Sequence, residues 1–233
     1  MLEDLRKQGQ SKGLATWDIE HSGDEVSHAW LTEQLATYRP DDAVLSEEGH
    51  DDLVRVGEQR VWIVDPLDGS SSYGMGSPEW AVHVALVIDG VAVAGAVASP
   101  GVGVVTSTHA PSQQQASGRT TPIIVAGRTR AWSDGAWVAK TIDAEVVACS
   151  SAGFKAALVA TGRADVYVHD SPLYEWDVCA PAVMASAFGL DVSDQHGGAL
   201  EFNKTQPVVS GLVICRQEFT ESVLHSLEVR RSG

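Results

Sequence analysis

The chain has few of the features that would place it in a membrane, a disulfide-linked fold or a zinc protein. None of its hydrophobic runs approaches the about 18 residues that a membrane-spanning helix needs. Its three cysteines, Cys149, Cys179 and Cys215, form no C-x-x-C pair and leave an odd thiol, so we expect small buried residues. Residues 1–11 are charged and lack the apolar region of a secretory signal, which favours a cytoplasmic protein.

Positive charge and histidine motifs are also scarce. The 16 Lys and Arg residues are outnumbered by 31 Asp and Glu, and the net charge of -15 repels nucleic acid polymers and anionic membranes. We therefore expect neither as a partner. None of the eight histidines forms an H-x-H or H-E-x-x-H set, so each is interpreted as a surface or packed residue. An anionic ligand would need local reversal of the field, which divalent cations on carboxylates could supply.

At 233 residues, with 44% hydrophobic and 20% charged residues, the chain has ordinary globular composition. Helical and strand patterns alternate along it without an internal repeat. Helices are predicted over 22–38, 129–140, 151–161, 177–188 and 219–227, and strands over 61–64, 80–88, 91–99, 123–125, 145–148, 165–169 and 212–215. Residues 107–121, rich in Ser, Gln, Thr and Gly, are the linker candidate between an N-terminal α+β half (1–106) and a C-terminal α/β half (122–233).

Three local patterns refine these elements. Asp89-Gly90 between two strands predicts a type I′ hairpin. Ser22 and Glu25 fit a capping box, which would place Asp24 in the first turn of its helix. Asp177 is expected at a helix N-cap.

The most informative segment is acidic. An apolar strand runs directly into Asp65-Pro66-Leu67-Asp68-Gly69-Ser70, where proline and glycine force a turn with both carboxylates on one side. Two metal ions could then share Asp65, and the backbone N–H groups of Gly69, Ser70 and Ser71 would seat a phosphate. An isolated Asp-x-x-Asp-Gly turn equally fits a solvated loop.

Two carboxylates elsewhere in the chain add weight to the metal-site interpretation. Glu47-Glu48-Gly49 supplies an acid with no helical or strand rationale, and Trp176-Asp177 sets an acid beside an aromatic ring. Asp177 alone would read as a plain N-cap. Together these acids are the oxygen ligands that Mg²⁺ prefers.

In this order the motifs resemble the inositol monophosphatase-like superfamily of Mg²⁺-dependent, lithium-sensitive phosphatases. The hallmarks are a Glu-Glu pair, a strand running into DPxDGT, and a WD-x-x-A segment; here they correspond to Glu47-Glu48, residues 65–70 and residues 176–180. The resemblance implies an α/β (α+β) protein, a layered α-β-α-β-α sandwich of the inositol monophosphatase/fructose bisphosphatase type.

Within that superfamily the chain is more similar to the bacterial CysQ type, the 3′(2′),5′-bisphosphate nucleotidases. The likeness lies in residues 40–48, 151–155, 167–169, 174–181 and 212–216. It implies hydrolysis of the 3′-phosphate from adenosine 3′,5′-bisphosphate, a by-product of sulfate assimilation, to give AMP. Activity on inositol monophosphate or fructose 1,6-bisphosphate, and a non-catalytic metal-binding relative, remain alternatives.

The resemblance also implies roles for single residues. The first of two to three Mg²⁺ ions would be held by Glu47, Asp65 and the Leu67 carbonyl, and the second by Asp65, Asp68 and Asp177. A water on the first ion would be oriented by the Ser70 hydroxyl, which Asp24 would hold. The substrate side would be lined by Gly153, Lys155, Asp170, Tyr174 and Glu175. Lys155 is the candidate for a second phosphate, or else a snorkelling helix residue.

The chain departs from the family pattern in two places. Position 70 is serine where the family usually has threonine, so the hydroxyl is retained but its rotamer is less restricted. Only residues 1–9 precede the first recognisable segment, whereas relatives carry a longer N-terminal helix. Missing cover would expose apolar surface and alter dimer contacts, so a homodimer is left open.

Overall fold

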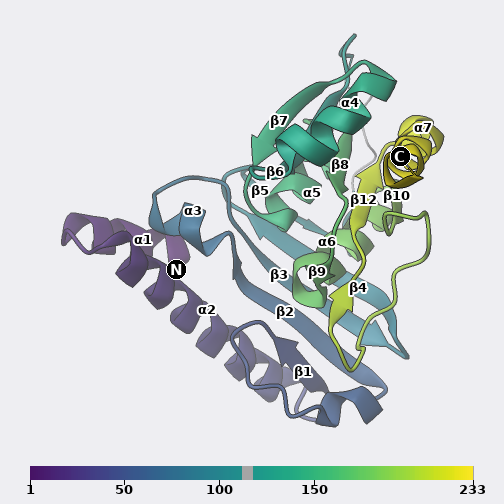
Figure 1. Ribbon diagram of the computed structural model, residues 1–233. Helices are drawn as coiled ribbons and strands as arrows, with labels where there is room; N and C mark the ends of the chain where they lie inside the picture. Colours follow the sequence, from purple (N-terminus) through teal and green to yellow (C-terminus); the bar gives the residue numbers. More distant parts are fainter. Residues whose placement is uncertain (112–117, 233) are drawn as a thin grey trace.

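Two five-stranded sheets alternate with three layers of helices in the computed structural model, which describes residues 1–111 and 118–232 (Figure 1). The layers are α1 and α2, the first sheet, α5 and α6, the second sheet, and α4 with α7. This order confirms the expected α-β-α-β-α sandwich. None of the helices in the described part of the chain is long and apolar enough to cross a membrane.

The first sheet has the strand order β1-β2-β3-β4-β5, with β1 parallel to β2 and the remaining pairs antiparallel. Its strands are β1 (Ala43–Ser46), β2 (Arg60–Asp68), β3 (Ala81–Ile88), β4 (Val91–Ser99) and β5 (Val104–Ser107). The Asp89-Gly90 hairpin is confirmed, because both residues have the positive φ (50° and 80°) that a type I′ turn requires.

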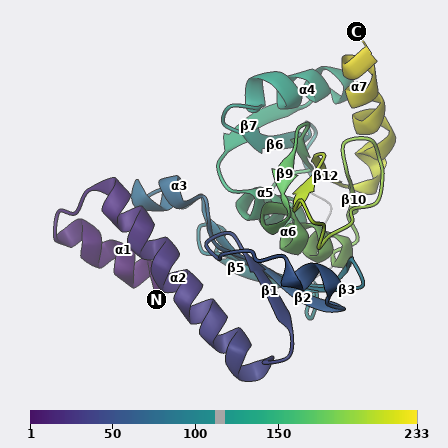
Figure 2. The same cartoon turned by 60° about the horizontal axis from the view of Figure 1, so that its bottom comes forward.

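Helix α2 (Thr16–Tyr38) packs against β2, and α1 (Leu2–Ser11) packs against α2. Figure 2 shows both helices on the side of the first sheet that faces away from the second. Helix α2 buries Ile19, Gly23, Ser27 and Leu31, which follow one another at helical spacing along one face. A Cβ on Gly23 would lie 2.7 Å from the Leu67 side chain, so only glycine lets α2 approach the acidic segment this closely.

The second sheet has the order β10-β12-β8-β6-β7, in which β6 runs parallel to both β7 and β8. Its strands are β6 (Ile123–Gly127), β7 (Glu145–Cys149), β8 (Val166–His169), β10 (Asp191–Ser193) and β12 (Leu212–Cys215). The outer layer is α4 (Ala136–Ile142) and α7 (Thr220–Ser232). A separate ribbon pairs β9 (Leu173–Tyr174) with β11 (Val208–Val209).

Between the sheets lie α5 (Ala152–Ala160) and α6 (Glu175–Ala187), and the largest hydrophobic core surrounds them. It joins residues of both sheets, such as Ile63 on β2 and Ile214 on β12, with residues along the whole of α5 and most of α6. The three cysteines are free and buried, as expected. Short elements complete the chain: α3 (Ser70–Gly74), 3-10 turns at Val54–Gly57 and Gln217–Phe219, and a π-helical turn at Ala131–Gly135.

Several predicted boundaries were wrong. Helix α2 begins at Thr16 rather than residue 22, so Asp24 lies in its interior and not in its first turn; the buried Ile19 carries the helix through the Ser22–Glu25 capping pattern. Helix α6 begins at Glu175, which puts Asp177 at N3, where Oδ2 accepts a hydrogen bond from the Tyr174 N–H at 3.2 Å. The helix predicted over 129–140 is instead a π-helical turn followed by α4.

Strand β2 does not stop at residue 64 but continues through the predicted turn to Asp68. The register with β3 shifts between Asp65 and Asp68. This irregularity accommodates Pro66, which has no backbone N–H to donate to the neighbouring strand. The predicted linker, 107–121, begins at Ser107, which still pairs in β5, and its residues 112–117 lie outside the described residues. The division into halves around it stays a prediction.

Candidate active site

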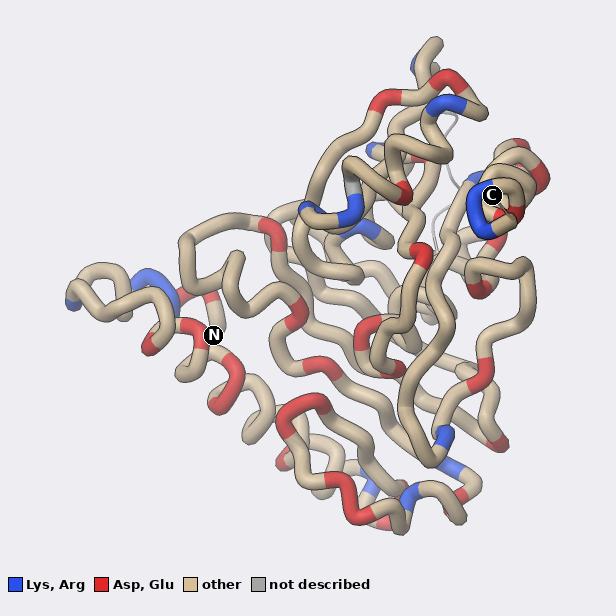
Figure 3. The backbone as a smooth tube through the Cα atoms, viewed as in Figure 1, with Lys and Arg blue, Asp and Glu red and all other residues tan. Residues whose placement is uncertain are grey.

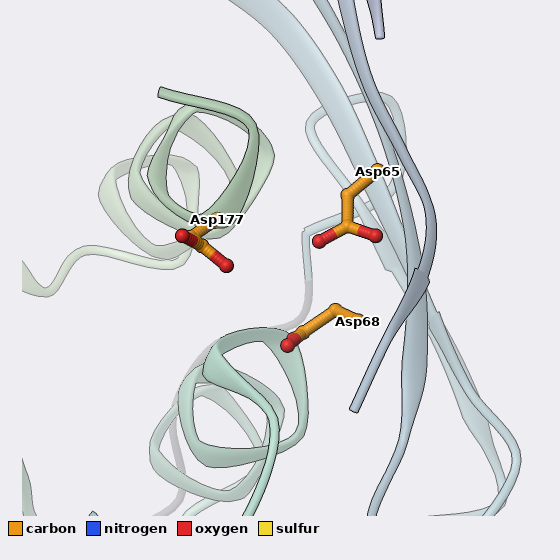
Figure 4. A group of neighbouring side chains, drawn as sticks. All are labelled: Asp65, Asp68 and Asp177. Carbon is orange, nitrogen blue, oxygen red and sulfur yellow. The ribbon is translucent and has the colours of Figure 1, made fainter. Parts of the chain in front are cut away.

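Three aspartates from distant parts of the chain meet where β2 ends and α6 begins. Asp65, Asp68 and Asp177 each offer a carboxylate oxygen within 4.8 Å of the others. Figure 4 shows the carboxyl groups of Asp65 and Asp68 facing that of Asp177 across a common space, with Asp177 on α6. The arrangement brings together acids that the sequence separates by more than a hundred positions.

Asp65 is the centre of this group and is wholly buried. Its Oδ1 accepts the Leu67 N–H at 3.0 Å, while Oδ2 has no hydrogen-bond partner among the described residues. Burial raises the pKa of Asp65 well above its usual range, and the charges of Asp68, Glu47 and Asp177 raise it further. The Oδ2 atom lies 3.9 Å from His83 Nδ1 and near the carboxyls of Asp68, Glu47 and Asp177. A buried carboxylate with an unpartnered oxygen among several acids fits a divalent cation, which would supply positive charge.

Asp68 has a different environment, although it is also buried. Its Oδ2 accepts hydrogen bonds from Ser151 Oγ at 2.6 Å and from the Gly153 N–H at 2.7 Å. Burial acts to raise the pKa of Asp68, but His83, Lys155 and the bond from Ser151 outweigh it, and the net shift is downward. Asp68 is therefore held ionised and fixed in direction by the first turn of α5.

The negative charges of the cluster also affect the remaining acids. Burial and the charges of Asp68 and Glu47 raise the pKa of Asp177 to about 7. Burial also raises the pKa of Glu47, and the neighbouring charges of Glu48 and Asp68 add to this effect. The pKa of Asp24 is raised to about 7 by burial first and then by Glu48, Glu47 and Glu20. The five predicted acids thus lie in one negative region.

The hydroxyl segment follows directly after Asp68. Gly69 has φ 85°, and a Cβ there would lie 2.8 Å from the Glu79 carbonyl oxygen, so glycine is required at this turn. Ser70 and Ser71 form the first turn of α3. Within the described residues no hydrogen bond joins Asp24 to Ser70. The side chain of Leu67 is buried against Tyr73 and Trp80 rather than in the site.

The predicted substrate-side residues lie in different environments. Gly153 contacts the three-aspartate cluster, because its N–H donates to Asp68 Oδ2. Lys155 is buried, with Nζ donating to the Ser151 carbonyl at 2.6 Å and lying 5.0 Å from the Tyr167 ring centroid, so it does not snorkel to solvent. Tyr174 is exposed and stacks on Trp176 with centroids 4.5 Å apart.

Two further acids of that predicted set are engaged elsewhere. Glu175 is wholly buried and accepts the N–H groups of Asn203 at 2.6 Å and Lys204 at 3.1 Å, so it holds a loop. Asp170 pairs with Arg231 at 3.1 Å and Arg230 at 3.5 Å. The structure does not bring either carboxylate together with the three-aspartate cluster.

His83 is the site residue that sequence reasoning missed. Its side chain is wholly buried on β3, directly opposite Asp65 in the strand pair, and its Nε2 lies 3.1 Å from Asp68 Oδ2. The available signal was a polar ring in the middle of an apolar strand. Its position beside the acids depends on the register between β2 and β3, which no local pattern reveals.

The layered fold and the carboxylate cluster between its sheets define an α/β protein with a candidate cation centre. The chain belongs to the inositol monophosphatase family, a family of metal-dependent phosphatases, whose model matches residues 5–230.

The chain is 35% identical over 229 residues to the 3′-phosphoadenosine 5′-phosphate phosphatase of Mycobacterium tuberculosis, with 91% of this chain and 82% of that protein covered. It is 29% identical to the 3′(2′),5′-bisphosphate nucleotidase CysQ of Escherichia coli, with 78% of each covered. Among solved structures, inositol monophosphatase II from Staphylococcus aureus matches with a TM-score of 0.77 at 18% identity, covering 99% of this chain and 92% of that one.

Proposed function

We propose that this protein is a Mg²⁺-dependent phosphomonoesterase that removes the 3′-phosphate of adenosine 3′,5′-bisphosphate to give AMP. The observation that carries the proposal is the cluster of three aspartates around the buried Asp65 carboxylate, whose Oδ2 atom has no hydrogen-bond partner among the described residues. Relatives named for this substrate, at 29% to 36% identity, support the choice within the family. Lithium sensitivity, a cytoplasmic location and a role in sulfate assimilation follow as parts of the same proposal.

The residues present fit two to three Mg²⁺ ions. Glu47, Asp65 and the Leu67 carbonyl would hold one, and Asp65, Asp68 and Asp177 another. Bound Mg²⁺ would supply a Lewis acid and lower the pKa of a water nucleophile toward neutrality. The first turn of α3, with Gly69, Ser70 and Ser71, would contact the phosphate, while Ser70 and Asp24 would orient the attacking water.

The Asp24 carboxyl suits that orienting role because its pKa is raised to about 7. At neutral pH it exists in both protonation states, so it can accept a hydrogen bond or a proton from a neighbouring hydroxyl. On the substrate side, Gly153, Lys155, Asp170, Tyr174 and Glu175 remain the residues proposed to select the alcohol. Exposed Tyr174, stacked on Trp176, offers a flat surface that suits a purine ring.

The first test measures phosphate release with Mg²⁺ from adenosine 3′,5′-bisphosphate, inositol monophosphate and fructose 1,6-bisphosphate. We expect the highest kcat/KM for the nucleotide. A higher value for the inositol or sugar phosphate would reassign the substrate. No release from any of the three would favour a non-catalytic metal-binding relative.

The second test replaces one carboxylate of the cluster. Asp68→Asn should abolish phosphate release, because a neutral amide is a poorer Mg²⁺ ligand. The matched control is Asp89→Asn in the exposed hairpin turn, where asparagine is equally suited to positive φ. Unchanged turnover in Asp68→Asn would defeat the proposed mechanism.

A homodimer is also part of the proposal. It is supported by a surface hollow between α1, α2 and the first sheet, lined among others by Met1, Trp30 and Pro100; the Trp30 side chain is 50% exposed. Light scattering should give twice the chain mass of 24.7 kDa. A mass of one chain would remove the dimer and leave the catalytic proposal intact.

A further inference from the structure

We propose that His83 is a positioning residue that fixes the spacing between the two walls of the metal site, an inference that rests on the proposed function. One wall is the end of β2 with Asp68, and the other is the first turn of α6 with Asp177. The imidazole reaches both. Its Nδ1 lies 3.0 Å from the Trp176 carbonyl oxygen, and its Nε2 lies 3.1 Å from Asp68 Oδ2.

The contact with α6 bears directly on Asp177. Trp176 is the residue before it, so a hydrogen bond from Nδ1 to the Trp176 carbonyl holds the turn that carries the Asp177 carboxylate. Because His83 sits on β3 in the middle of the first sheet, this bond ties the helix to a rigid element. The ring is wholly buried, so water does not compete for it.

The contact with Asp68 is of another kind. Nε2 lies close to Oδ2 without a hydrogen bond between them, so the ring packs directly against this carboxylate oxygen. The same Oδ2 already accepts from Ser151 and Gly153. Three groups thus engage one oxygen of Asp68, while no hydrogen bond within the described residues occupies Oδ1. His83 helps to turn that second oxygen toward the cation.

The space for the ring is created by a glycine. A Cβ on Gly153 would lie 2.0 Å from His83 Nε2, which is closer than any side chain tolerates. The glycine in the first turn of α5 is therefore required by the histidine. This gives Gly153 a role independent of substrate contact, since its N–H also binds Asp68.

Groups that orient metal ligands from behind are typically worth about 10- to 100-fold in metal affinity. The test compares His83→Leu, which keeps the bulk and removes both nitrogens, with His83→Asn and His83→Gln. The asparagine amide can take the place of Nδ1 toward Trp176, and the glutamine amide that of Nε2 toward Asp68. Calorimetry with Mg²⁺ alone, without substrate, reports the metal affinity of each folded variant.

We expect His83→Leu to weaken Mg²⁺ binding by about tenfold or more, with a smaller change in the KM for the phosphate substrate. His83→Asn and His83→Gln should each recover part of the affinity. His225→Gln, on the outer helix α7, is the matched control and should bind Mg²⁺ as the wild type does. If His83→Leu does not fold, the two amide variants carry the test by themselves.

A double substitution checks the steric half of the argument. Gly153→Ala should weaken Mg²⁺ binding when His83 is present. The loss of affinity should be smaller in a His83→Ala background, because the ring that the added methyl group would strike is gone. Purely additive effects would remove the coupling that we propose.

Two outcomes separate this inference from the proposed function. Wild-type Mg²⁺ affinity in folded His83→Leu, together with phosphate release by the unmodified protein, would overturn the role of His83 alone. Mg²⁺ binding that depends on His83, in a protein that hydrolyses none of the phosphates, would overturn the function alone.

Discussion

Two groups of aspartates, Asp134 with Asp170 and Asp65 with Asp68 and Asp177, are neutralised in opposite ways. In the π-helical turn before α4, Asp134 accepts Arg230 Nη1 at 2.7 Å and the Asp170 N–H at 3.0 Å, and Asp170, just after β8, pairs with Arg231. In the first sheet, Asp65 forms no ion pair with an arginine or lysine of the described residues and keeps an unpartnered oxygen. Burial is common to both groups, so burial does not identify a metal site.

The pKa values record this difference. Burial acts to raise the pKa of Asp134, but the bond from Arg230 and its other donors lower it overall. For Asp65, burial and the neighbouring charges all act upward. Figure 3 shows where the charged residues lie along the chain: those of α2 are all acidic, whereas α7 carries both acidic and basic residues. Within the cluster, Asp65 is therefore the carboxylate that most needs an external cation.

The largest expected effect is that of Asp65→Asn. It should lower phosphate release by about a thousandfold or more, about 4 kcal/mol of barrier, because it removes the acid proposed to be shared by two ions. The metal-free variant should at the same time have a higher thermal midpoint than the wild type, because a buried charge without a partner is removed. Phosphate assays and thermal unfolding in chelator measure the two changes. A lower midpoint in chelator would mean that Asp65 is stabilised by partners that the fold already supplies.

The corresponding change in the other group should have the opposite pattern. Asp134→Asn should destabilise the protein by about 2 kcal/mol, because it weakens a buried ion pair and leaves Arg230 without its nearest carboxylate. Mg²⁺ affinity should stay as in the wild type. Urea unfolding gives the free energy of unfolding, and calorimetry gives the affinity. A loss of Mg²⁺ binding in the folded variant would break the separation between the two groups.

Local turn patterns and the family resemblance were enough to predict the layered fold, the hairpin and the acidic segment from the sequence. The Asp89-Gly90 hairpin and the glycine after Asp68 were predictable because positive φ at those positions restricts the residue type. The start of α2 was not, since a Ser-x-x-Glu pattern such as that of Ser22 and Glu25 also occurs inside helices.

Contacts between distant segments were out of reach. Glu175 is used by the backbone of 203–204, and Lys155 by the carbonyl of Ser151 and the ring of Tyr167. Each looked free for a substrate because its partner depends on tertiary packing. His83 was missed for the same reason, because its place opposite Asp65 follows from strand register.

The smallest expected effect is a change of stability with pH. It tests whether burial and the cations around β8 keep His169 uncharged. Burial lowers the pKa of His169, at the end of β8, from 6.5 to about 4, and the charges of Lys155 and Arg130 lower it further. Between those two pH values the unfolded chain binds a proton that the folded protein does not. His169 therefore costs no stability above pH 6.5 and favours unfolding increasingly as the pH falls toward about 4.

Acids with raised pKa values, such as Asp177, act in the opposite direction over part of this range, so the whole curve does not isolate the histidine. The difference between the wild type and His169→Gln does, because glutamine can keep the contact that His169 makes with Ser171 Oγ at 2.9 Å. In urea unfolding, the variant should gain stability relative to the wild type as the pH is lowered from 6.5 to 4. A constant difference across that interval would mean that His169 is protonated in the fold, and that the cations beside β8 do not set its charge.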